Sequence, residues 1–160
     1  IQEVMGWTDS HLHDFHWRGE RFGLPDPEFD EERVVDERTV TLKELGLSIK
    51  DRLEYVYDFG DGWEHVLTVE QVLEAGEHQT PVCLKGARSC PPEDCGGAWG
   101  YENLLDILKD PTHEEYEEWK TWLPENFDPE QCDLAEVNRA LSVKQWTLSP
   151  SSKKGRRKKV

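Results

Sequence analysis

The clearest periodic pattern in the chain is an alternation of hydrophobic and polar residues on both sides of a glycine-rich turn. Leu53, Tyr55 and Tyr57 fall on one face of a strand, and the alternation resumes over residues 66–72. The intervening turn reads Asp-Phe-Gly-Asp-Gly. Glycine adopts positive φ, and aspartate accepts hydrogen bonds from nearby backbone amides, so this composition is typical of a hairpin turn. The pattern predicts a β-hairpin over about residues 52–72.

The rest of the pattern indicates an α+β domain. Residues 11–17 alternate as a strand does, whereas residues 24–36 are rich in proline and acid and indicate a surface loop. Residues 39–47 are predicted to form a short helix that ends near Gly46. After Gly100 the hydrophobic spacing becomes helical. The sequence therefore predicts an antiparallel sheet with a central hairpin, followed by a helical C-terminal half.

Capping signals indicate where helices begin and end. Two residue pairs match the pattern of a capping box, and each stands at the start of a segment with helical hydrophobic spacing. The pairs are Thr112 with Glu115, and Asp133 with Glu136. Gly6 closes what looks like the last turn of a helix at the start of the chain. From this we expect that the N-terminal part of the domain is missing from the chain.

Composition predicts one domain with a well-hydrated surface. At 160 residues the chain can bury a core without metals or disulfides. Seven tryptophans offset the low hydrophobic content of 36%. No apolar run approaches the roughly 20 residues of a membrane span, and no secretory leader is visible in the sequence. We therefore expect a cytoplasmic protein with no membrane partner.

Charge is distributed unevenly along the chain. The formal net charge is −15, yet six of the last eight residues are basic. Without them the body carries 13 basic and 34 acidic residues, a net charge of −21. Such a body repels a phosphate backbone, so it is not expected to bind DNA directly. Residues 143–160 are expected to be disordered, and the basic tail at 153–159 could contact nucleic acid weakly, act as a localisation signal or only solubilise the chain.

Two segments concentrate aromatic, acidic and glycine residues and form the candidate ligand site. Its candidate residues are Asp58, Asp61, Trp63, Glu64, His65, Glu93, Asp94 and Tyr101. Turn chemistry explains the aspartates of the hairpin but not the tryptophan and histidine that follow. If Trp63 and His65 point outward with Asp61, they form an aromatic and polar patch suited to a peptide or small ligand. A hard cation at the hairpin tip, or an aspartate that orients His65 as a general base, is the alternative.

The cysteines offer a second kind of chemistry. Cys83, Cys90 and Cys95 have six and four residues between them, which is not the Cys-x-x-Cys spacing of strong zinc motifs. With one histidine they could still complete a tetrahedral zinc site. The candidate histidines are His11, His13, His16 and His65. Unliganded thiols that pack a proline-rich loop are the alternative, and no cofactor other than zinc is indicated.

Two long motifs resemble the hallmarks of a known family, the plasmid pRiA4b ORF-3-like proteins. They are YVYDFGDGWEH at residues 55–65 and CPPEDCGG at residues 90–97, the latter followed by Gly100-Tyr101. Similar matches at Met5-Gly6-Trp7, 10–15, 127–130 and 137–138 extend the resemblance over about residues 1–142. The resemblance implies an α+β domain of bacterial and archaeal plasmids and insertion sequences, in which a strand-strand-helix unit precedes position 1. No reaction is established for the family, so it implies no catalytic residue.

The sequence thus predicts a non-enzymatic binding or interaction domain associated with mobile elements, whose protein or small-molecule partner it does not identify. Two alternatives stay open. One is a metal-dependent enzyme that uses Asp58, Asp61, His65 and the cysteines. The other is an acidic DNA mimic, or an accessory protein of a mobile element, that occupies a nucleic-acid-binding protein.

Overall fold

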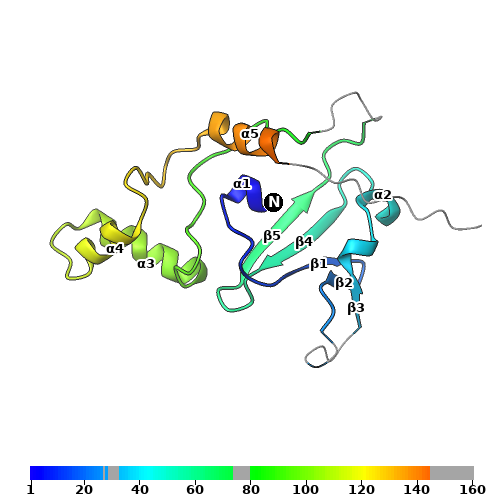
Figure 1. Ribbon diagram of the computed structural model, residues 1–160, viewed down its shortest axis with the longest axis horizontal. Coiled ribbons are helices and arrows are strands. Elements are labelled where there is room, and N and C mark those ends of the chain that lie inside the picture. The colour runs from blue at the N-terminus through cyan, green and yellow to red at the C-terminus, as the bar shows by residue number, and fades with distance from the viewer. Residues whose placement is uncertain (27, 29–32, 74–79, 145–160) are drawn as a thin grey trace, which may run out of the picture.

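A computed structural model of the chain describes residues 1–26, 28, 33–73 and 80–144. Of the predicted disordered tail at 143–160, Val143 is helical, and residues 145–160 lie outside the described residues. Within them, strands form one open sheet in the order β3-β2-β1-β4-β5 (Figure 1). The strands are β1 His13–Trp17, β2 Glu20–Gly23, β3 Val34–Asp36, β4 Arg52–Tyr57 and β5 Trp63–Thr68. The helices are α1 Gln2–Met5, η1 Glu37–Thr39 (a 3-10 turn), α2 Leu42–Leu45, α3 Gly97–Lys109, α4 Tyr116–Trp122 and α5 Leu134–Val143. The α+β prediction is confirmed.

The predicted hairpin is confirmed as β4 and β5, which pair in antiparallel register. Its turn uses the predicted chemistry, because Asp58 Oδ1 accepts hydrogen bonds from the backbone N–H groups of Gly60 and Asp61 at 2.9 and 3.3 Å. The second strand begins earlier than the alternation suggested, at Trp63. The unexplained tryptophan and histidine therefore belong to the strand and not to the turn.

One loop prediction is partly wrong. The last residues of the expected loop at 24–36 form β3, which pairs parallel with β2. The sheet is therefore mixed and not purely antiparallel. Val34 and Val35 are β-branched, which favours a strand, but a three-residue strand is too short to show periodicity in the sequence.

The two predicted capping boxes have different outcomes. At the start of α5, Asp133 accepts a hydrogen bond from the Glu136 backbone N–H at 2.9 Å, which is the N-cap half of the predicted box, while the Glu136 carboxylate accepts a hydrogen bond from Arg139. The box at Thr112 and Glu115 is wrong. Glu115 is itself the N-cap of α4, without a side-chain cap, and the Thr112 hydroxyl donates to Asp110 Oδ1 at 2.7 Å.

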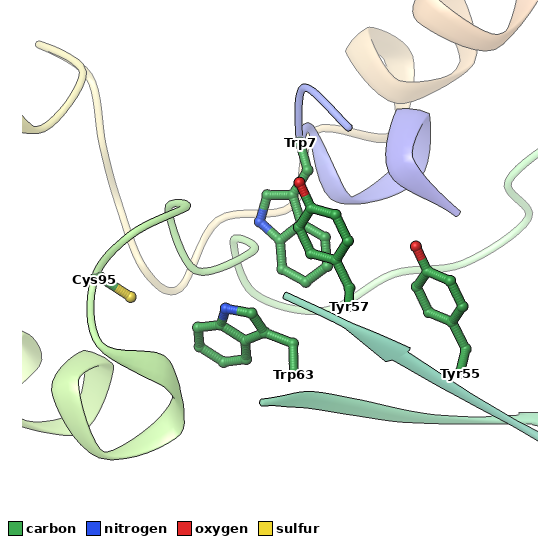
Figure 2. Packing of buried hydrophobic residues seen from close by; sticks show 5 residues of the cluster. All are labelled: Trp7, Tyr55, Tyr57, Trp63 and Cys95. Atoms are coloured by element: carbon green, nitrogen blue, oxygen red, sulfur yellow. The ribbon is translucent and has the colours of Figure 1, made fainter. Parts of the chain in front are cut away.

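The core lies on the face of the sheet to which alternate residues of β4 point. One cluster comprises Trp7, Tyr55, Tyr57, Trp63 and Cys95 (Figure 2), and the other comprises Trp17, Phe22 and Leu53. Tyr55 and Tyr57 are almost completely buried. Burial raises the pKa of Tyr55 to about 12, since the phenolate loses its hydration.

The helices lie on two sides of the hairpin. The N-terminal α1, which ends at Gly6 with φ 73° as predicted, lies beside α5 (Figure 1). The helices α3 and α4 lie beside each other, and α3 begins next to the hairpin turn, where Gly97 approaches Asp61. Among the described residues, no helix is long and apolar enough to cross a membrane.

Candidate functional site

Three segments that are distant in the sequence meet at the hairpin turn. They are residues 7–11, the turn itself and residues 90–97. At their junction His11 Nδ1 lies 3.6 Å from Asp58 Oδ2, and His11 Nε2 lies 3.1 Å from Asp94 Oδ1. One ligand atom from each of these three residues lies within 4.8 Å of the other two. The junction therefore brings an imidazole and two carboxylates to one point.

Asp58 is positioned by the hairpin turn. It is mostly buried, has φ 54°, and donates its backbone N–H to the Leu12 carbonyl oxygen at 2.9 Å. One carboxylate oxygen is used by the turn amides, which leaves Oδ2 to face His11. The turn thus serves both as a local structure and as the support of a site residue.

Asp94 is positioned through its neighbour Glu93. The Glu93 carboxylate accepts hydrogen bonds from the Thr8 backbone N–H at 3.0 Å and from the Thr8 hydroxyl at 2.7 Å. It also accepts one from the Tyr57 hydroxyl. Burial raises the pKa of Glu93, but these hydrogen bonds outweigh burial and hold the pKa below its ordinary value. Glu93 therefore ties residues 90–97 to the N-terminal segment and the sheet.

Asp61, another candidate, joins the turn to the start of α3. Its Oδ2 accepts a hydrogen bond from the Gly96 N–H at 3.1 Å. The next residue, Gly97, has φ 67° and packs directly on the Asp61 carbonyl group. Asp61 therefore has a structural contact that accounts for its presence.

The outward patch of Trp63 and His65 is not formed. Both side chains point to the inner face of β5, and Trp63 is 9% exposed and packs with Trp7 and Cys95 (Figure 2). His65 contacts the Trp7 ring edge-on at 5.5 Å between centroids, and its Nδ1 lies 3.1 Å from the Trp63 carbonyl oxygen. The reason is strand register, because β5 begins at Trp63 and alternate residues face the core.

The remaining candidates divide between surface and core. Glu64 lies on the outer face of β5 and is exposed. Tyr101 is half-buried against the cluster around Trp7, and burial raises its pKa. Neither belongs to the group formed by His11, Asp58 and Asp94.

The structure does not gather the cysteines that the zinc hypothesis requires. In the described ranges, the group of His11, Asp58 and Asp94 is the one set of three potential ligands within 4.8 Å. Cys90 Sγ lies 3.7 Å from Met5 Sδ, and Cys95 is buried. Burial raises the pKa of the Cys90 thiol to about 12 and that of the Cys95 thiol to about 11. Cys95 belongs to the core cluster, and Cys90 packs against it.

Thiol burial leads to a prediction for alkylation. At about pH 8, Cys90 and Cys95 should react with iodoacetamide much more slowly in the folded protein than in urea, since burial raises the pKa of both thiols and the thiolate is the nucleophile. Timed alkylation followed by peptide mass spectrometry measures each site. Unfolding in urea should make the four rates similar. Rates at Cys90 and Cys95 that do not rise on unfolding would contradict the burial of these two thiols.

An apolar groove lies apart from the junction. It is a groove of about 590 Å³ between α2 and the sheet, and its lining is mainly apolar. The apolar lining residues include Phe15, Phe22, Leu42, Leu45, Leu53 and Leu67. We place the candidate site at the junction because that is where ionisable groups converge.

Comparison with known proteins adds the family. A model of the plasmid pRiA4b ORF-3-like proteins matches residues 1–136. The chain belongs to this family. The chain is similar to the uncharacterized protein y4hQ of Sinorhizobium fredii (strain NBRC 101917 / NGR234), with 37% identity over 142 residues, which are 88% of this chain and 73% of that protein.

The family fold is also represented among solved structures. The crystal structure of a protein of unknown function, MM3350 from Methanosarcina mazei Go1, has 38% sequence identity and a TM-score of 0.74. The match covers 86% of this chain and 78% of that one. The family match confirms the predicted family, and neither of these two similar proteins carries an assigned activity in its name.

Proposed function

We propose that this protein is a binding domain that holds a divalent cation through His11, Asp58 and Asp94. The observation that carries the proposal is the convergence of one imidazole nitrogen and two carboxylate oxygens, from three separate segments, within 4.8 Å. One nitrogen and two oxygen donors suit Mn²⁺ or Zn²⁺, since imidazole favours zinc and carboxylate favours manganese. The proposed site replaces the cysteine site with a different set of ligands.

Direct pairing explains this cluster less well than a cation does. His11 Nε2 is buried without a hydrogen-bond partner in the described part of the chain, although it lies 3.1 Å from Asp94 Oδ1. The approach is therefore close but not aligned for a hydrogen bond. Asp58 is also mostly buried, and a buried carboxylate needs a positive partner. The net charge of −15 further raises the local concentration of cations.

A metal-dependent enzyme is the second candidate, and the small number of protein ligands favours it. Three protein ligands are typical of catalytic zinc sites, which keep a position for water or substrate. Compared with the enzyme that the sequence suggested, Asp58 remains a metal ligand. His11 and Asp94 take the place of Asp61, His65 and the cysteines as the other ligands. Water-proton relaxation with Mn²⁺ tests the open position that the enzyme requires. Strong enhancement supports an open position, and the absence of exchangeable water on the bound ion excludes this enzyme.

The metal proposal predicts the effect of Asp94→Asn. Asp94 is exposed, and its φ of 60° is tolerated by asparagine, so the variant should fold normally. Loss of one anionic ligand should raise the dissociation constant for Mn²⁺ or Zn²⁺ by about tenfold or more. Isothermal titration calorimetry on chelator-treated protein measures this constant. Saturating metal should also raise the thermal midpoint of the wild type more than that of the variant.

Asp9→Asn is a matched control for this experiment. Asp9 is also exposed, has φ 59°, and lies 3.5 Å from the Nδ1 atom of another histidine, His13. The control should bind metal within about twofold of the wild type, because His13 is not part of the cluster. The proposal fails if the wild type binds neither ion saturably, or if both substitutions weaken binding equally.

A further inference from the structure

A second site lies next to the proposed metal site, on one face of α4. A pocket of about 270 Å³ is lined by Asp94, Glu115, Glu118, Trp119 and Trp122. The α4 N-cap Glu115 and the α4 residues Glu118, Trp119 and Trp122 follow the spacing i, i+3, i+4, i+7, which puts them on one stripe of the helix. The hydrophobic spacing of this helix predicts a packing stripe of Tyr116, Trp119, Lys120 and Leu123, which shares Trp119 with the pocket stripe.

The pocket has two aromatic walls. The rings of Trp119 and Trp122 are 5.2 Å apart and lie at 82° to each other, so they form two perpendicular walls. Trp122 is 46% exposed, far more than a core tryptophan such as Trp7. The face of an indole ring attracts cations through its quadrupole, and tryptophan is the strongest of the aromatic residues in this respect.

The charged groups of the pocket indicate which cation fits. Asp94, Glu115 and Glu118 supply carboxylates, and the lining contains no lysine or arginine. Within the part of the chain that the structure describes, neither glutamate forms an ion pair. A quaternary ammonium group cannot donate hydrogen bonds to carboxylates. A guanidinium group stacks on an aromatic ring and donates up to five hydrogen bonds.

We propose that this pocket binds the guanidinium group of an arginine side chain in a peptide or protein partner. Trp119 and Trp122 hold the plane of the group, and Glu118 and Glu115 accept its hydrogen bonds. A free amino acid is less suitable, because the lining has no basic group for its carboxylate and three acidic groups that repel it. The site does not depend on the proposed metal, although Asp94 contributes to both.

The test uses N-acetyl-arginine amide, which mimics an arginine within a peptide. Calorimetry on the full chain should show saturable binding in the millimolar range, and the indole N–H signals of Trp119 and Trp122 should shift in NMR spectra. Glu118→Gln and Trp122→Leu should each weaken binding about fivefold to tenfold. Chelator-treated protein should bind the probe, because the two tryptophans and two glutamates of the pocket are not proposed metal ligands, so failure of the metal site leaves this result unaffected.

Neighbouring residues provide matched controls. Glu117→Gln makes the same change of charge one position away, outside the pocket, and Trp99→Leu removes a tryptophan that is 85% exposed. Both should bind the probe within about twofold of the wild type. Absence of saturable binding, or equal losses in Glu117→Gln and Glu118→Gln, would overturn the proposal. Choline that binds as tightly as the probe would refute the guanidinium assignment, and tighter binding of free arginine would refute a peptide source.

Discussion

Gly97→Ala should destabilise the protein more than alanine at any other glycine with positive φ in the described part of the chain. A β-carbon at Gly97 would lie 2.2 Å from the Asp61 carbonyl oxygen and 3.1 Å from its carbonyl carbon, and neither backbone atom can rotate away. The φ of 67° adds the left-handed cost of about 1–2 kcal/mol. Together with overpacking of about 1–3 kcal/mol, the free energy of unfolding should fall by roughly 2–5 kcal/mol. Urea denaturation followed by circular dichroism measures it.

Gly46→Ala separates the two contributions. Gly46 has φ 63°, nearly that of Gly97, but a β-carbon there meets nothing within 4 Å. This variant should lose only the conformational cost, about 1–2 kcal/mol. The excess loss in Gly97→Ala then reports the contact between the hairpin turn and the start of α3. Equal losses in the two variants would mean that this close contact does not exist in solution.

Trp7→Ala is the second large effect that we expect. Trp7 is 7% exposed, stacks on Tyr57 with ring centroids 4.7 Å apart, and packs against Trp63 at 5.9 Å (Figure 2). Its indole N–H donates to the Pro91 carbonyl oxygen at 2.8 Å. Removal of a buried aromatic ring costs about 3–5 kcal/mol, because a cavity remains. That is a large part of the roughly 5–15 kcal/mol by which a domain is stable. Thermal or urea unfolding measures the loss.

Two further variants serve as controls for Trp7→Ala. Trp99→Ala removes an indole that is 85% exposed, and should change stability by no more than about 0.5 kcal/mol. Trp7→Phe keeps an aromatic ring beside Tyr57 but loses the hydrogen bond to Pro91. Its loss of stability should therefore lie between those of Trp7→Ala and Trp99→Ala. A Trp7→Ala loss as small as that of Trp99→Ala would contradict the central place of Trp7 in the core.

The hairpin was predictable because it depends on local chemistry. Alternation of hydrophobic residues at Leu53, Tyr55 and Tyr57 indicates the buried face of a strand, and the Asp-Gly composition indicates the turn. The short strand β3 and the absent capping box at Thr112 were not predictable in this way. A three-residue strand has no measurable period, and a capping pattern forms only if the helix begins at the expected residue.

The candidate site was predicted in parts. Asp58 and Asp94 were predicted as ligand-binding residues in two separate motifs. His11 was predicted only as one of four histidines that could complete a zinc site with the cysteines. Their meeting depends on contacts far apart in the sequence, such as the hydrogen bonds of Glu93 to Thr8 and Tyr57. No local pattern encodes such pairings, so the sequence could not join the three residues.

By itself the sequence determined the family, the α+β class, the hairpin and the residues from which a site could be built. The tertiary structure decided which of them are core and which face one another. It placed Trp63, His65 and the buried cysteines in or against the core, and it brought His11, Asp58 and Asp94 together. The physical reason is that backbone periodicity is set by neighbouring residues, whereas a site at the junction of three loops is set by packing between distant segments.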